Sequence, residues 1–117
     1  MSNSPFTIEH HQAKRCDIFT PHGRIDSSTA PQLEEALKSV IEAGRYNIVV
    51  NLSDVSFLSS AALRVLVSAA QQCRKLGRGG DVYLAEVPEQ LKEVFDLTGL
   101  DHLFKFFETD AEAAGSF

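Results

Sequence analysis

A nearly continuous apolar run at residues 46–52 constrains the fold of this chain more than any other feature. The run is rich in β-branched side chains and lacks the strict alternation of a strand with one wetted face. Such a run is typical of a strand that is covered on both faces, as in sheets whose parallel strands are joined by crossover helices. We therefore expect residues 46–52 to form a central strand of a sheet that contains parallel pairs.

Segments of helical and strand-like pattern alternate along the rest of the chain. In the first helical segment, apolar side chains recur at i, i+3, i+4, i+7 and i+8 from Leu33 to Ile41. Thr29 and Gln32 have the spacing of a capping box, and Pro31 fits a first helical turn. The expected helices begin near Pro31, Ala61 and Pro88 and end at Gly44, Gly77 and Gly99. The expected strands are residues 6–11, 16–22, 46–52, 81–85 and 103–107.

This order, β-β-α-β-α-β-α-β, predicts an α/β domain with a mixed sheet. A chain of 117 residues holds one hydrophobic core, so we expect a single domain over residues 1–117. Its core would span about residues 6–107, followed by a tail at 108–117. Within this tail, residues 110–115 are either a short helix or a frayed end.

The composition of the chain argues against several classes of function. Eleven Lys and Arg against sixteen Asp and Glu give a net charge of −5, which argues against a nucleic-acid partner. The two cysteines, Cys16 and Cys73, form no CxxC pair, and the four histidines lack metal-ligand spacing, so we expect no cofactor and no metal. No basic and apolar leader starts the chain, and no run approaches the ~18 apolar residues that span a bilayer. We expect a cytoplasmic protein.

The polar segment after the central strand is the most informative part of the chain for function. Residues 53–60 would lie at the carboxyl end of that strand, where α/β sheets carry their functional loops. The segment ends in Ser59 and Ser60 at a helix start, where one hydroxyl can cap the helix while its neighbour stays available to solvent. A phosphate on such a hydroxyl is favoured by the helix dipole. Arg64, one turn later, would offset its charge, and Asp26 and Asp54 would oppose it if their loops converge.

Three motifs in this order and spacing resemble the STAS domain of bacterial anti-sigma factor antagonists. They are Gly-Arg-Ile-Asp at 23–26 with Thr-Ala-Pro at 29–31, the segment 50–63, and Leu-Thr-Gly-Leu at 97–100. The resemblance covers residues 6–107. It implies a non-enzymatic regulator that binds an anti-sigma factor, which is commonly also its serine kinase, and that is reset by a serine phosphatase.

The resemblance also implies the roles of individual residues. Alignment on Phe57 and Leu63 places the family's phosphoacceptor, which lies in an Asp-Ser-Ser/Thr-Gly-Leu pattern, at Ser60. The sequence departs from that pattern at Ser59, where the family has Asp, and at Ala62, where it has Gly.

The partner-binding residues are accordingly expected to be Asp26, Asp54, Ser59, Ser60 and Arg64. In this set Ser60 is the phosphoacceptor or contact and Ser59 the helix cap. The two aspartates organise the loop, and Arg64 contacts the partner.

The sequence also allows two other functions. STAS-like domains also occur as partners or appendages of membrane transporters, and the missing Asp at position 59 makes an accessory subunit of a transport assembly an alternative. An enzyme with Ser59 or Ser60 as nucleophile is the weaker alternative, because the chain lacks the GxSxG elbow that exposes such a serine.

Overall fold

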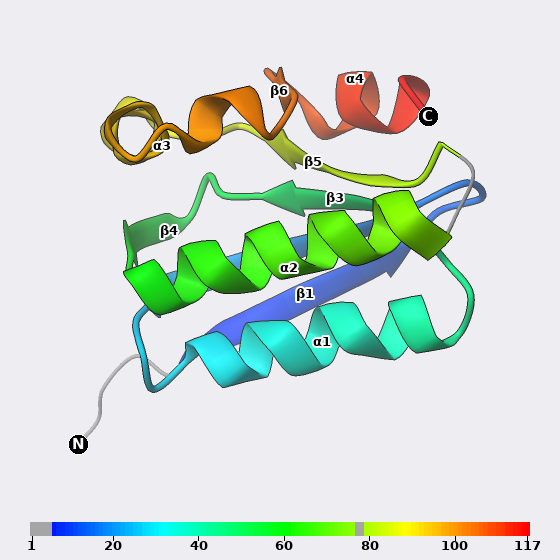
Figure 1. Cartoon of the computed structure of the whole chain (residues 1–117), viewed down its shortest axis with the longest axis horizontal. Coiled ribbons are helices and arrows are strands. Elements are labelled where there is room, and N and C mark those ends of the chain that lie inside the picture. Colours follow the sequence, from blue (N-terminus) through cyan, green and yellow to red (C-terminus); the bar gives the residue numbers. More distant parts are fainter. Residues whose placement is uncertain (1–5, 77–78) are drawn as a thin grey trace.

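A computed structural model of the chain describes residues 6–76 and 79–117, and shows one mixed sheet with helices on both faces (Figure 1). The strands run in the order β1-β2-β3-β5-β6, and β4 pairs with β2 outside this path. β1 is antiparallel to β2, and all other strand pairs are parallel. The strands are β1 (Thr7–Gln12), β2 (Asp17–Ile25), β3 (Asn47–Asn51), β4 (Val55–Leu58), β5 (Asp81–Ala85) and β6 (Phe106–Phe107). The predicted α/β fold with its N-terminal hairpin is therefore confirmed.

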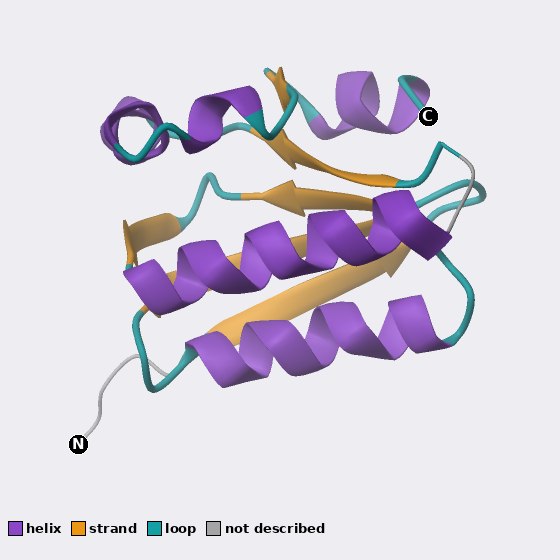
Figure 2. Cartoon of the chain, viewed as in Figure 1, coloured by secondary structure: helices purple, strands orange, loops and turns teal. Residues whose placement is uncertain are grey.

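The two longest helices, α1 (Ala30–Glu42) and α2 (Ser60–Leu76), lie side by side across one face of the sheet (Figure 2). The apolar stripe predicted for α1 is buried, with Leu33, Leu37, Val40 and Ile41 in the main core. The chain continues through α3 (Glu89–Leu97), a 3₁₀ turn (Leu100–His102) and α4 (Asp110–Gly115). Of the two alternatives for residues 110–115, the structure has the helix. Among the described residues, no helix is both long and apolar enough to cross a membrane.

The central strand is covered on both faces, as its composition predicts. Ile48 and Val50 of β3 belong to the core beneath α1 and α2. Val49, between them, belongs to a second cluster with Tyr83 of β5 and Ala113 of α4. Since successive strand side chains point to opposite faces, α4 closes the face that α1 and α2 leave open.

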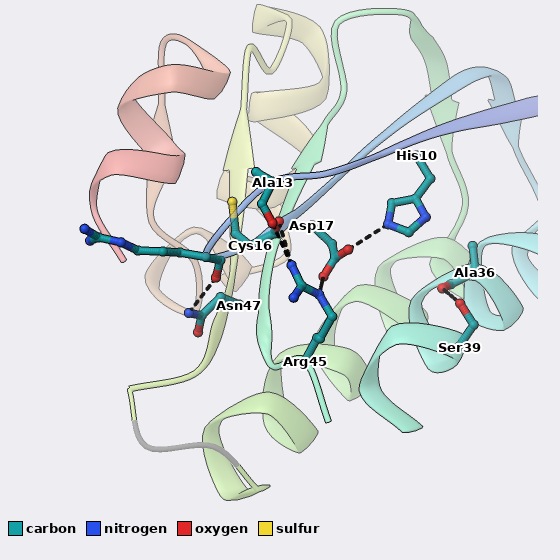
Figure 3. Close-up of polar contacts among 9 residues, drawn as sticks. His10, Ala13, Cys16, Asp17, Ala36, Ser39, Arg45 and Asn47 are labelled. Carbon is teal, nitrogen blue, oxygen red and sulfur yellow. Dashed lines mark hydrogen bonds and ion pairs between the residues drawn. The ribbon is translucent and has the colours of Figure 1, made fainter. Parts of the chain in front are cut away.

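A buried ion pair joins the N-terminal hairpin to the connection between α1 and β3 (Figure 3). The Asp17 side chain is 0% exposed, and its carboxylate accepts hydrogen bonds from Arg45 Nε at 2.5 Å and from His10 Nε2 at 2.8 Å. The Arg45 guanidinium also donates to the carbonyls of Ala13 and Cys16 in the hairpin turn. These contacts satisfy a carboxylate that would otherwise be costly to bury.

Two details differ from the sequence predictions. Residues 55–58 form a strand where a loop was expected, because they pair in parallel with the far end of β2. The last strand covers only Phe106–Phe107, because residues 103–105 leave the 3₁₀ turn as a turn and bend and make no strand pairing. The predicted end of the second helix at Gly77 lies outside the described residues.

The predicted capping box at α1 is also wrong. Thr29 precedes α1 but makes no side-chain cap hydrogen bond to the helix. Its hydroxyl instead donates to the Arg24 carbonyl at 2.8 Å and accepts from the Asp26 N–H at 2.9 Å. Thr29 and Gln32 have the spacing of a capping box, but no cap forms because the Asp26 N–H already donates to the Thr29 hydroxyl.

Candidate functional site

Ser59 uses its hydroxyl, its carbonyl and its N–H to hold the start of α2 in place. Its Oγ accepts a hydrogen bond from the Ala62 N–H at 3.1 Å, and its carbonyl accepts from the Leu63 N–H at 3.0 Å. Its own N–H donates to the Ile25 carbonyl at the end of β2, at 2.9 Å. Ser59 thus has the N-cap geometry that the sequence predicts, and it ties α2 to the end of β2.

Ser60 differs from its neighbour in being exposed. It is the first residue of α2, and within the described part of the chain its hydroxyl has no hydrogen-bond partner. Arg64, four positions later on the same helix, is also exposed. A hydroxyl and a guanidinium one turn apart therefore face solvent together at the positive end of the helix dipole.

Asp26 organises the turn between β2 and α1. Its Oδ1 accepts hydrogen bonds from the Ser28 hydroxyl at 2.7 Å, the Ser28 N–H at 2.9 Å and the Thr29 N–H at 3.1 Å. The Ser28 hydrogen bonds hold the pKa of Asp26 below its usual range, and those from Thr29 act in the same direction. The carboxylate follows Ile25, to which Ser59 is bonded, so it lies near the start of α2 as a fixed negative charge.

A groove of about 270 Å³ opens between the first halves of α1 and α2. Arg64 and Val65 contribute to the α2 wall, and Pro31 and Glu34 contribute to the α1 wall. Pro31 and Glu34 were not among the site residues predicted from the sequence. No local pattern could have indicated them, because the groove exists only where the two helices pack.

Asp54 lies apart from the other site residues. It precedes β4, whereas Ser59 follows it, so the two are separated by five residue steps, roughly 16 Å of extended chain. The Asp54 carboxylate bonds to His22, at 2.5 Å, instead of facing the start of α2. The fold therefore gathers Asp26, Ser59, Ser60 and Arg64 near the start of α2. Asp54 is not part of this group.

The cysteine side chains are poor nucleophiles in this fold. Burial raises the pKa of both thiols above the usual value, that of Cys73 to about 11. Cys16 and Cys73 are therefore protonated at neutral pH. Residues 6–76 and 79–117 contain no group of three or more His, Cys, Asp and Glu side chains arranged to hold a metal ion.

Comparisons with known proteins identify the family of this chain. The STAS domain family matches residues 7–113. BtrV of Bordetella bronchiseptica, described as a candidate anti-sigma factor antagonist, is 32% identical over 81% of this chain and 80% of its own length. The anti-sigma-B factor antagonist of Listeria monocytogenes is 28% identical over 97% of both chains.

A solved structure shows the same fold. The crystal structure of an anti-sigma factor antagonist from Mycobacterium paratuberculosis superposes with a TM-score of 0.84. It has 28% sequence identity, over 96% of this chain and 93% of that one. The family match, these relatives and the shared fold together show that this chain belongs to the STAS domain family, among its anti-sigma factor antagonists.

Proposed function

We propose that this protein binds an anti-sigma factor through the first turn of α2 and the adjoining groove between α1 and α2. The named relatives support the kind of partner, and the exposed pair Ser60 and Arg64 supports the place. Binding the anti-sigma factor frees the sigma factor, so the protein acts in the cytoplasm by exchange of partners and catalyses no reaction. Asp26 fixes the turn between β2 and α1, and Ser59 fixes the start of α2, so these two residues position the surface.

Ser60 is the proposed switch within this surface. The observation that carries this role is that Ser59 is used as the cap while the Ser60 hydroxyl remains exposed and unbonded among the described residues. A phosphate on Ser60 would add about 1.5–2 negative charges at neutral pH. The helix dipole and Arg64 favour that charge, and the nearby Asp26 carboxylate opposes it. Phosphorylation would then change the docking surface and leave the core intact.

The first test is phosphorylation by the cognate anti-sigma factor, which we propose is also the kinase. Intact-mass spectrometry after incubation with ATP should show one added phosphate, mapped to Ser60. Ser60→Ala should abolish the addition, and Ser59→Ala should retain it because Ser59 only caps the helix. A phosphate that maps elsewhere, or no phosphate on the unaltered protein, would contradict the proposed switch.

The second test measures binding directly by calorimetry. Ser60→Glu should weaken binding to the anti-sigma factor by about tenfold or more, which corresponds to ~1.4 kcal/mol. Ser39→Glu is the charge-matched control, because Ser39 is an exposed serine nearer the other end of α1, and it should leave binding unchanged. If Ser60→Glu and Asp26→Ala both bind like the unaltered protein, this surface is not the contact.

A further inference from the structure

His22 lies between two carboxylates that come from different parts of the fold. Its Nδ1 is 2.5 Å from Asp54 Oδ2, in the turn between β3 and β4. Its Nε2 is 2.8 Å from Glu9 Oε2, on β1. The backbone joins the same segments, because the Gly23 N–H donates to the Asp54 carbonyl at 3.0 Å. Three segments of the chain thus meet at one imidazole ring.

This geometry favours the protonated form of the ring. An ionised carboxylate only accepts hydrogen bonds, so each ring nitrogen of His22 must donate to its partner. A neutral imidazole carries one N–H, whereas an imidazolium carries two. Both contacts can therefore exist together only when His22 is protonated.

The charges around the ring favour the same state. Asp54 faces His22 from the β3–β4 turn and Glu9 faces it from β1, while Thr7, opposite His22 in the β1–β2 register, is neutral. On its own strand the nearby cation is Arg24, whose guanidinium lies 4.3 Å from the centroid of the Phe57 ring. The hydrogen bond to Asp54, followed by that to Glu9, raises the pKa of His22 above its usual value.

We propose that protonated His22 is a clasp that fastens the β3–β4 turn to the N-terminal hairpin and that opens as pH rises. Loss of the ring proton leaves one N–H for two carboxylates, so one of the two contacts is lost. β4 begins directly after Asp54 and ends directly before Ser59, so the clasp fixes the start of the strand that leads to α2. This inference does not depend on the partner or on phosphorylation of Ser60.

Histidine titration by NMR tests the clasp on the unaltered chain. The ring signals of His22, assigned by their loss in His22→Gln, should titrate above the usual histidine value of 6.5. Asp54→Asn and Glu9→Gln should each shift that titration downward, because each removes one accepting carboxylate. The exposed His102, on the 3₁₀ turn, is the internal control, and its ring chemical shifts at one fixed pH should be the same in both variants. A His22 titration at or below 6.5 that neither variant moves would overturn the proposal.

Thermal unfolding as a function of pH provides an independent readout. A histidine whose pKa is higher in the folded than in the unfolded state stabilises the fold fully below about pH 6.5. This stabilisation disappears as the pH rises through the pKa of the folded state. The melting temperature of the unaltered protein should therefore exceed that of His22→Gln near pH 6, and the difference should shrink by about pH 9. A difference that stays constant between these pH values would count against a proton-dependent contact.

Discussion

Ser59 and Ser60 are adjacent in the sequence, yet their hydroxyls have different surroundings. The Ser59 hydroxyl accepts from the Ala62 N–H, and the exposed Ser60 hydroxyl has no partner among the described residues. The sequence indicated that one hydroxyl caps α2 while the other faces solvent. The cap is at Ser59, as predicted from the sequence, because Ser59 lies just before the first helical residue and its hydroxyl accepts from the Ala62 N–H.

This difference predicts effects of different size on stability for two similar substitutions. Ser59→Ala removes the N-cap and should lower the free energy of unfolding by about 1 kcal/mol. Ser60→Ala removes an exposed hydroxyl and should change it by less than about 0.5 kcal/mol. Urea unfolding of both variants measures the difference. Equal losses, or a larger loss for Ser60→Ala, would contradict the assignment of the cap.

At the scale of elements, the Asp17–Arg45 ion pair connects the hairpin to the segment between α1 and β3. The sequence alone does not indicate this pair, because Asp17 and Arg45 are 28 positions apart and neither lies in a recognisable motif. Removing one partner of a buried ion pair costs much stability, since the remaining charge stays buried without a partner. The pair therefore ties the hairpin turn to the segment between α1 and β3.

Arg45→Ala should lower the free energy of unfolding by about 3 kcal/mol, the lower end of the range for a broken buried pair. The lower end applies because the Arg45 side chain is 30% exposed, while Asp17 is 0% exposed. Arg15→Ala, at an exposed arginine of the hairpin turn, is the control and should cost less than about 0.5 kcal/mol. Chemical denaturation compares them, and similar losses in both variants would refute a structural role for the pair.

β4 shows why an element can escape a sequence prediction. Its four residues, Val55–Leu58, alternate poorly, with the two end residues buried and the two middle ones exposed. It is a strand because Gly23, Arg24 and Ile25 of β2 offer it a parallel partner. That partner lies more than thirty positions earlier, where no local window reaches it.

At the scale of the whole molecule, the C-terminal residues complete the fold. α4 covers the sheet face opposite α1 and α2, and Ala113 on α4 is 0% exposed. Phe117 stacks on Tyr83 of β5, with ring centroids 4.1 Å apart and planes 7° apart. The Asn51 side chain donates to Asp110 at 2.8 Å, which ties α4 to the end of β3. The end of the chain is thus part of the second core.

Phe117→Ala should lower the free energy of unfolding by about 1–2 kcal/mol, from lost apolar burial and lost stacking on Tyr83. Leu97→Ala is the control, because Leu97 is a large apolar residue that is 87% exposed, and it should be nearly neutral. Calorimetric melting of both variants gives the comparison. A Phe117→Ala protein as stable as Leu97→Ala would mean that the C-terminal residues contribute little to the fold.

The sequence by itself determined the central strand, the two long helices and the pair of serines at the start of α2. These features depend on apolar spacing and capping, which act between residues a few positions apart. Only the tertiary structure decided that β4 pairs with β2, that Asp54 bonds to His22 instead of approaching Ser60, and that a groove opens beside Arg64. These features join residues that are distant in the sequence, such as His22 and Asp54 at a separation of 32, and such contacts form only once the sheet has placed their strands.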